Sequence, residues 1–402
     1  MRVRMLVFRD YDRDPRVWRE ADAVAQAGAR VEIYMLRRAS QPEVSELAHG
    51  VRVFRTTSIR PDTKKPWQAV KGYSAFWRGV GRDRADVYHC HDGATLPVGL
   101  RLARRDGAKL LYDAHEYFSD YAPAPPGESF VDLIRRRWLP DYVWERLLIR
   151  RPDRCLTVTD RIARLMRETY RLAETPAFVR NSAPYWAPTA EHQARLRRSI
   201  GAAESEVIIT FLGSGQNQDR YALESDWQRG LGVVMDALPA GARLAVIQEA
   251  GPEYERGVRE RAERSGHSAQ VSCVRPEDYD DYLELASGGD IGVYLMTEPS
   301  TNRAEAMPNR LFDFVMARLP LVVGPGTAMT RVVEEYKIGA VADSVKPDAV
   351  GEAIGRIMPA TGQAAQLAEN LEHAARDLCW ETESRRLLDV YAAFINGDRA
   401  SA

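Results

Sequence analysis

The sequence lacks any apolar run long enough to cross a lipid bilayer, although hydrophobic residues make up 45% of its 402 positions. A membrane-spanning helix needs about 20 consecutive apolar residues, so a helical integral membrane protein is excluded. The N-terminal stretch MRVRMLVFRDYD also lacks the apolar core of a signal peptide and soon reaches acidic residues. We therefore expect a cytoplasmic protein.

Cysteine is scarce, and none of the four cysteines stands close to another. Cys90, Cys155, Cys273 and Cys379 have no partner at the spacing of a zinc finger or of a redox motif. We expect four isolated, reduced thiols and no structural zinc site.

The chain has almost no net charge, −1, which argues against a general nucleic-acid-binding protein. The charge is nevertheless unevenly distributed. Residues 1–180 contain 34 Lys and Arg against 24 Asp and Glu, a net +10, whereas residues 181–402 contain 22 against 33, a net −11. A basic first half suits an anionic ligand or an anionic membrane surface, and a solvated arginine-rich surface explains it equally well.

The first half alternates short apolar segments with amphipathic ones, a pattern that predicts a parallel sheet with helices on both faces. From Asp14 to Gly28, apolar residues recur at helical spacing. Pro15 suits the first turn of this helix, and Gly28 suits its end. Strands are expected at Val3–Phe8, Val31–Leu36, Val51–Arg55, Val87–His91, Lys109–Ala114 and Arg154–Val158.

The alternation breaks near residues 179–203, where Asn181 and Pro184 interrupt it, and then begins again. Because the chain is also longer than one hydrophobic core usually organises, we predict two doubly wound α/β domains in series. Strands of the second half are expected at Val207–Leu212, Arg243–Gln248, Ala269–Val274, Ile291–Tyr294 and Leu321–Val323.

We expect the first domain to span residues 1–190, the second 191–380, and a C-terminal segment 381–402. Two doubly wound domains that face one another form a cleft at the carboxyl ends of their strands, where such sheets usually bind ligands. The turn Gly213-Ser214-Gly215 follows an apolar strand and allows a ligand to approach the backbone, or is a plain connection. A dinucleotide fingerprint requires a third glycine at position 218, which is Gln218, so a nicotinamide cofactor is not expected.

The most informative stretch runs from Glu305 to Asp313 and precedes an apolar strand. Within it, Pro308 fits the first turn of a helix. Free backbone N–H groups at such a helix start, with Arg310 one turn in, can hold a pyrophosphate. Carboxylates beside that site suit the hydroxyl groups of a sugar. Solvated charges at both carboxylates are the alternative, which their spacing alone leaves open.

The phrase MPNRLFDFVMARLPLVV in this stretch resembles the retaining glycosyltransferases of the GT-B fold, specifically the GT4 family. In that family a Glu-x7-Glu motif precedes an apolar strand. This chain departs from it with Arg310 for Lys, Arg318 for Gly and Asp313 for the second Glu. The resemblance implies an α/β protein of two Rossmann-like domains facing across a cleft, with a C-terminal helix that crosses back to the first domain.

The resemblance also implies a donor site in the second domain. Asp313 would bind the ribose, and Glu305 would contact the transferred sugar. Arg229, which precedes Gly230, would neutralise the pyrophosphate; Arg229, Arg310 and Glu305 would all act in catalysis. The expected donor-nucleotide residues are Gly213, Ser214, Gly215, Arg229, Asn309, Arg310, Leu311 and Asp313.

The first half resembles one GT4 subgroup in the segment from Asp14 to Gly28 and at two strand ends. Tyr88-His-Cys-His-Asp92 and Tyr112-Asp-Ala-His-Glu116 match that subgroup's signatures. The resemblance places His115 near the donor sugar as a further catalytic residue. The expected acceptor-binding residues are Asp14, Arg16, His91, Asp92, Glu116 and Tyr117.

Residues 130–151 combine several arginines with Trp138, Tyr142 and Trp144. A basic aromatic helix can lie in a membrane interface. Pro140 interrupts the segment, however, and helices at this point of the fold commonly pack inside the domain. A peripheral contact at the inner membrane face and internal packing are the two alternatives.

We therefore predict a glycosyltransferase that moves a hexose-type sugar from a UDP-, GDP- or dTDP-sugar to an acceptor that bears a hydroxyl group or another nucleophile. By resemblance, the anomeric configuration is retained and no metal or other cofactor is required. The basic first domain suits an anionic or lipid-linked acceptor, and the aromatic residues 112–144 suit a small natural product. A nucleotide-sugar 2-epimerase of the same fold and a non-catalytic sugar-nucleotide-binding protein are the alternatives.

Overall fold

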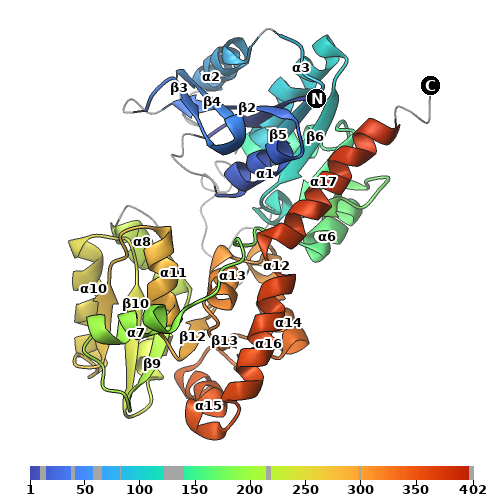
Figure 1. Ribbon diagram of the computed structural model, residues 1–402. Helices are drawn as coiled ribbons and strands as arrows, with labels where there is room; N and C mark the ends of the chain where they lie inside the picture. The colour runs from blue at the N-terminus through green and yellow to red at the C-terminus, as the bar shows by residue number, and fades with distance from the viewer. Residues whose placement is uncertain are drawn as a thin grey trace. The chain divides into compact units, whose positions relative to one another are not determined.

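The computed structural model describes residues 1–9, 15–37, 41–57, 66–81, 83–121, 140–213, 219–297 and 300–397. Contacts divide the chain into two compact units. The first unit comprises Met1–Arg180 and Glu383–Ala402, and the second comprises Asn181–Thr382. In each unit, helices flank a largely parallel sheet (Figure 1).

The sheet of the first unit has the strand order β3-β4-β2-β1-β5-β6-β7-β8. All neighbouring strands pair in parallel except β3 and β4, which are antiparallel. The strands are β1 (Arg2–Val7), β2 (Arg30–Arg37), β3 (Val44–Glu46), β4 (Arg52–Thr57), β5 (Val87–His91), β6 (Lys109–Ala114), β7 (Arg154–Thr157) and β8 (Ala177–Phe178).

The helices of the first unit follow the sequence signals expected of them. Helix α1 begins at Pro15, and the chain leaves it through Gly28, whose φ of 89° favours glycine. The helices are α1 (Pro15–Gln26), α2 (Pro66–Gly79), α3 (Leu96–Asp106), α5 (Pro140–Leu148), α6 (Asp160–Tyr170) and α17 (Trp380–Gly397), with short 3₁₀ turns η1 (Ala48–Gly50), η2 (Gly93–Thr95) and η3 (Phe118–Tyr121).

The sheet of the second unit has the order β11-β10-β9-β12-β13-β14, and every pair is parallel. The direction of winding reverses between β9 and β12, the place where doubly wound sheets bind ligands. The strands are β9 (Val207–Leu212), β10 (Ala242–Ile247), β11 (Val271–Val274), β12 (Ile291–Tyr294), β13 (Leu321–Val323) and β14 (Gly339–Val341).

Both faces of this sheet are buried. On β9, Ile208 and Leu212 belong to one apolar cluster, whereas Ile209 and Phe211 belong to another. Helices therefore cover both faces, as a parallel sheet requires. They are α7 (Ala190–Ser199), α8 (Asp219–Gln228), α9 (Leu231–Asp236), α10 (Pro252–Arg264), α11 (Tyr279–Ser287), α12 (Thr301–Glu305), α13 (Asn309–Met316), α14 (Ala328–Tyr336), α15 (Pro347–Ile357) and α16 (Ala364–Asp377), with the 3₁₀ turn η4 (Pro359–Thr361).

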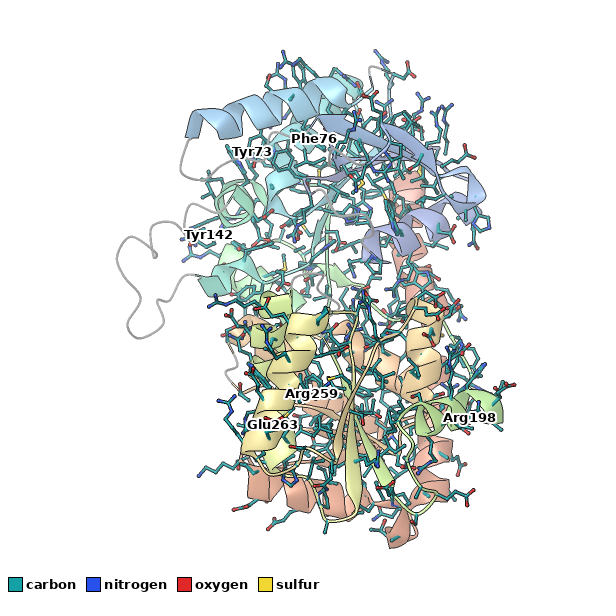
Figure 2. All side chains as sticks on the ribbon, turned by 90° about the vertical axis from the view of Figure 1, so that its left-hand side faces the viewer. Tyr73, Phe76, Tyr142, Arg198, Arg259 and Glu263 are labelled. Carbon is teal, nitrogen blue, oxygen red and sulfur yellow. The ribbon has the colours of Figure 1, made fainter. Side chains whose placement is uncertain are left out.

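Helices of both units bury apolar side chains and expose charged ones (Figure 2). Phe76 of α2 is fully buried in the first unit. On α10 of the second unit, Tyr254 and Val258 are buried, while Arg259 and Glu263 are exposed. This division is what an amphipathic helix on a sheet requires.

The fold class predicted from the sequence is confirmed: both units are α/β with doubly wound parallel sheets. Three short strands, β3, β8 and β14, were not predicted. Glu305 is the last residue of helix α12. Among the described residues, no helix is long and apolar enough to cross a membrane.

Candidate functional site

Polar side chains gather at the carboxyl ends of β5 and β6 in the first unit. His91 ends β5, and His115 directly follows β6. Their Nδ1 and Nε2 atoms lie 3.2 Å apart, within hydrogen-bonding distance. Nε2 of His115 also lies 3.1 Å from Oδ2 of Asp113, the penultimate residue of β6. Two predicted site residues therefore meet at a carboxylate that was not predicted as a site residue.

Arg16 of α1 anchors that carboxylate. Its Nε and Nη2 atoms each donate to Asp113 over 2.8 Å, a two-pronged contact, and its Nη1 donates to the Val179 carbonyl over 2.7 Å. Burial alone would raise the pKa of Asp113, but Arg16 and His115 hold that pKa well below its usual range. Asp113 is therefore a fully buried anion beside the ring of His115, which is 17% exposed.

A second buried carboxylate and a third histidine extend the cluster. Oε1 of Glu20 lies 3.0 Å from Nε of Arg16, and Oε2 lies 3.7 Å from Nε2 of His89. His89 Nδ1 lies 2.9 Å from the hydroxyl of Tyr391 on α17. Burial and the neighbouring His91 lower the pKa of His89 well below its usual value, which keeps its ring neutral.

Four of these groups stand close enough to be considered as metal ligands. One ligand atom from each of Glu20, His89, His91 and Asp113 lies within 4.8 Å of the others. However, the guanidinium of Arg16 already contacts both carboxylates. A cation at this place would meet that positive charge, so the residues fit a buried polar network better than a metal centre.

Asp92, also predicted as a site residue, has a strained backbone. Its φ of 62° and ψ of 161° lie in a region that is essentially reserved for glycine. Its Oδ1 accepts from the backbone N–H of His115 over 3.1 Å, and its Oδ2 accepts from Arg9 over 2.7 Å. Burial raises the pKa of Asp92, but His115 and Arg9 outweigh it and lower that pKa. The hydrogen bond from the backbone of His115, a predicted catalytic residue, holds Asp92 in this strained conformation.

The other predicted residues of the first unit are placed differently. The Tyr117 side chain is buried, and its hydroxyl lies 2.7 Å from that of Thr169 on α6. Glu116 is half-buried. Asp14 lies outside the described residues, as do residues 130–139 of the segment considered for membrane contact. The remainder of that segment includes α5, on which Glu145 is fully buried.

In the second unit, Asp313 and Arg310 lie together on the first turns of α13. Nη1 of Arg310 lies 3.1 Å from Oδ2 of Asp313. The hydroxyl of Tyr279, at the start of α11, donates to Oδ1 of Asp313 over 2.6 Å. The Arg310 guanidinium lies over the ring of Tyr282, 4.7 Å from its centroid. Nearby Tyr282 and Asp313 raise the pKa of Arg310 against the opposing effect of burial, so Arg310 stays charged.

Arg229, the basic residue predicted for the pyrophosphate, follows α8. Its Nη1 lies 3.1 Å from Oδ1 of the fully buried Asp226. The other oxygen of Asp226 accepts from Gln248 over 3.0 Å and from Tyr254 over 2.8 Å. Asp226 is a buried anchor that the sequence did not single out. It fixes Arg229 beside the ends of β9 and β10.

The glycines at this end of the sheet allow close packing. A Cβ on Gly213 would lie 2.4 Å from the side chain of Gln248, and one on Gly230 would lie 2.6 Å from Leu295. Gly230 also has a φ of 87°. Ser214 and Gly215 lie outside the described residues.

Glu305, Asn309 and Leu311 have separate environments. The Glu305 carboxylate contacts Nη2 of Arg331 on α14. Asn309 is the first residue of α13, whose preceding Pro308 is not yet helical, and Leu311 is buried in the core. Arg220 on α8 is exposed and pairs with Glu224.

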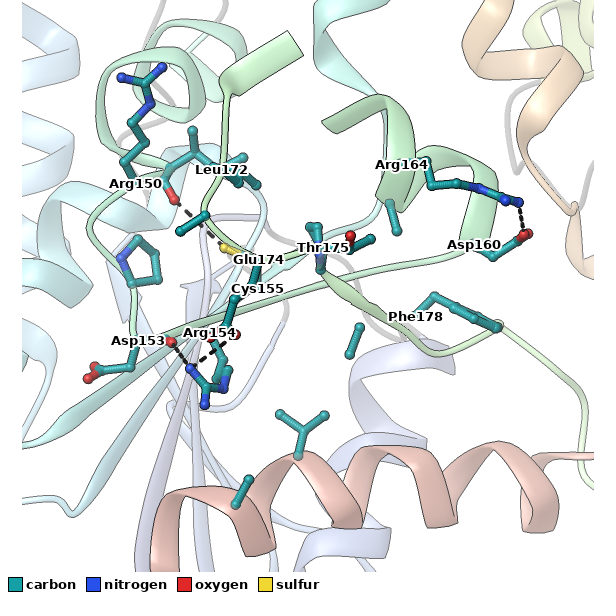
Figure 3. A pocket seen from close by; sticks show the side chains of 18 of the residues that line it. Arg150, Asp153, Arg154, Cys155, Asp160, Arg164, Leu172, Glu174, Thr175 and Phe178 are labelled. Carbon is teal, nitrogen blue, oxygen red and sulfur yellow. Dashed lines mark hydrogen bonds and ion pairs between the residues drawn. The ribbon is translucent and has the colours of Figure 1, made fainter. Parts of the chain in front are cut away.

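Two hollows complete the description. One, of about 440 Å³, lies after β10 and β11 and is lined by Glu249, Arg275, Pro276 and Glu277. The other is an open groove of about 1170 Å³ in the first unit, along edge strand β8 (Figure 3). Two of its arginines pair with acids, Arg164 with Asp160 and Arg154 with Glu174 (Figure 3).

Comparison with known proteins places this geometry in context. Residues 14–182 match the family model of the glycosyl transferase 4-like domain. The D-inositol 3-phosphate glycosyltransferase of Salinispora tropica is 23% identical, over 92% of this chain and 78% of that protein. Among solved structures, the sucrose-phosphate synthase of Thermosynechococcus elongatus has a TM-score of 0.73 at 14% identity, covering 98% of this chain and 99% of that one. Anabaena HepE, solved in complex with UDP-glucose, has a TM-score of 0.68 at 13% identity, covering 98% and 100%.

Proposed function

Since the chain is a GT4-type glycosyltransferase with the GT-B fold, we propose that it moves a hexose-type sugar from a nucleoside-diphosphate sugar to a hydroxyl-bearing acceptor. One observation carries the proposal. The Arg229 carbonyl accepts from the N–H of Leu295, directly after β12, and Arg310 pairs with Asp313 over 3.1 Å on α13, which follows β12 along the chain. Two cations and a carboxylate therefore lie on segments that follow the carboxyl end of β12, where the winding of the sheet reverses.

These groups suit the two ends of a nucleoside diphosphate. The arginines carry the positive charge that a departing diphosphate needs, and stabilisation of developing charge is usually the largest single contribution to catalysis. The start of α13 supplies backbone N–H groups next to Arg310. Asp313, paired with Arg310 over 3.1 Å, marks the end of the site that would hold the ribose. HepE, of the same fold, binds UDP-glucose, which supports a nucleotide sugar as donor, with UDP, GDP and dTDP as the candidate carriers.

We further propose that transfer retains the anomeric configuration and needs no metal ion. In this scheme the acceptor hydroxyl attacks the anomeric carbon while the bond to the diphosphate oxygen breaks on the same face. The departing phosphate oxygen takes the proton of that hydroxyl. The chain's own part is to hold the diphosphate through Arg229 and Arg310 and to exclude competing water.

For the first unit, we propose that His115 and the neighbouring strand-end residues bind substrate hydroxyl groups. His115 is the exposed end of a network that reaches through Asp113 to the buried Arg16. These contacts fix the orientation of the imidazole ring, so His115 presents the same edge to each substrate.

The test is product analysis with a panel of UDP-, GDP- and dTDP-sugars, with and without an acceptor library. Transfer predicts that nucleoside diphosphate appears in quantity only when an acceptor is present, together with one glycosylated product. Asp313→Ala should weaken donor binding. A 2-epimerase would convert the sugar without an acceptor, and a binding protein would give no product with any pair, and either result would contradict the proposal.

A further inference from the structure

The Asp313 carboxylate, expected to face the donor ribose, is enclosed in the structure. It is only 2% exposed. One oxygen accepts from the Tyr279 hydroxyl over 2.6 Å, and the other lies 3.1 Å from Arg310. A ligand hydroxyl therefore reaches this carboxylate only past the groups that already bind it.

Tyr279 is the more exposed of the two residues that contact the Asp313 carboxylate. It is 41% exposed, one of the few large apolar side chains with such exposure among the described residues. Its ring stacks against that of Tyr282, with centroids 6.0 Å apart and planes inclined by 16°. The phenol is thus fixed by stacking on one side and by Asp313 at its tip, while part of it remains accessible.

The chemistry of this pair suits a sugar hydroxyl. A phenol that donates its proton to a carboxylate can also accept a hydrogen bond through its oxygen. Hydrogen bonding to an anion also polarises the phenol and makes its oxygen a better acceptor. Asp313 is one methylene shorter than the glutamate that the GT4 motif carries at this position. The Tyr279 hydroxyl, which donates to Asp313, is therefore placed to make the ribose contact that the longer glutamate would make directly.

We propose that Tyr279 is the residue that contacts the ribose diol of the donor, and that Asp313 acts through it as a positioning residue. The proposal rests on the function proposed above. It predicts that the protein selects ribose over 2′-deoxyribose, and hence UDP or GDP over dTDP.

The experiment measures the affinity of UDP and GDP, and of their 2′-deoxy counterparts, by titration calorimetry. Wild type, Tyr279→Phe, Asp313→Asn and the double variant are compared. In Tyr279→Phe, the loss of one hydrogen bond to the ribose should lower the affinity about tenfold for whichever of UDP and GDP the wild type binds more tightly. The wild type should bind the 2′-deoxy form about tenfold more weakly, Tyr279→Phe should bind both forms equally, and the double variant should lose no more than either single variant.

The chain offers a matched control. The hydroxyl of Tyr336, at the end of α14, donates to Asp377 over 2.6 Å, the same geometry as in the Tyr279–Asp313 pair. Helix α14 starts after the carboxyl end of β13 and runs back along the sheet, which puts Tyr336 at the opposite end of the strands. Tyr336→Phe should leave both affinities unchanged.

Two results would overturn the proposal, and they are distinguishable. If Tyr279→Phe binds as tightly as wild type, or still discriminates against the 2′-deoxy form, the ribose contact lies elsewhere while the proposed function stands. If wild type binds no nucleoside diphosphate at all, the proposed function fails and this inference fails with it. Circular dichroism of each variant checks that the fold is retained.

Discussion

Removal of Arg16 is the sharpest test of the buried network in the first unit. Arg16 lies against the carboxylates of Asp113 and Glu20, both fully buried, and makes two 2.8 Å contacts to Asp113. In Arg16→Ala both carboxylates lose their cation while they stay buried. Breaking a buried ion pair from one side costs about 3–5 kcal/mol, a large part of the ~5–15 kcal/mol that stabilises a domain.

The dependence of this loss on pH follows from the pKa of Asp113. That pKa lies well below its usual value of 3.8 because Arg16 and His115 outweigh burial. A carboxylate with a depressed folded-state pKa adds stability above its unfolded pKa, and this stability is lost as the pH falls through the folded pKa. The difference between wild type and Arg16→Ala should therefore be largest near neutral pH and shrink as the pH falls below about 4.

The assay is urea unfolding followed by circular dichroism at several pH values, with Arg19→Ala as the control. Arg19 lies on the same helix, and its Nε donates to the Pro15 carbonyl over 2.9 Å. The double variant Arg16→Ala/Asp113→Asn should recover part of the loss, since it removes one of the stranded charges. A loss under about 1 kcal/mol at pH 7, equal to that of Arg19→Ala, would show that Arg16 does not stabilise the buried carboxylates.

Three further predictions concern other parts of the chain. Burial raises the pKa of Glu145 to about 8 from a usual 4.5. Because the folded-state pKa is raised, the free energy of unfolding should fall by about 1 kcal/mol per pH unit between these two values. Glu145→Gln should flatten this slope in urea titrations from pH 4 to 9. Gly230→Ala should lower the melting temperature of the second unit in calorimetry, because its Cβ would lie 2.6 Å from Leu295 at a φ of 87°. Arg229→Ala should lower turnover at least tenfold in a transfer assay without loss of fold, since Asp226 keeps its bonds from Gln248 and Tyr254.

Much of the fold follows from sequence pattern because its central strands are buried on both faces. Five predicted strands, including Val87–His91 and Ile291–Tyr294, have the observed bounds, since apolar runs between polar turns mark them at both ends. The missed strands gave no such signal. β8 has two residues and β14 three, and β3 lies at an edge with exposed Val44 and Glu46, so pairing with neighbours rather than their own composition defines them.

The site was predictable only in part. His115 and Asp92 follow apolar strands, and that position alone marks them as candidates. Asp113 and Arg16 are 97 residues apart, and no local pattern joins them. One signal was available, however. Arg16 and Glu20 are spaced as neighbours on the apolar face of α1, where a charge pair is costly and therefore indicates a buried partner.

In the second unit, the motif that ends at Asp313 predicted a helix start at Pro308, and α13 begins at Asn309. It could not reveal Tyr279 of α11, whose hydroxyl donates to Asp313, or Asp226, whose carboxylate pairs with Arg229. Both are long-range contacts between side chains. The Glu305 contact to Arg331 depends likewise on helix packing, between α12 and α14.

The central claim is that this protein binds and uses a nucleoside-diphosphate sugar. The most direct measurement is a thermal-shift screen of UDP-, GDP- and dTDP-sugars against wild type and Arg229→Ala. Ligand at 100 times its dissociation constant stabilises the native state by about 2.7 kcal/mol, enough to raise the melting temperature by several degrees. Wild type should show such a rise with a ribonucleotide sugar and Arg229→Ala a smaller one, whereas a flat profile over every donor would contradict binding of a nucleoside-diphosphate sugar.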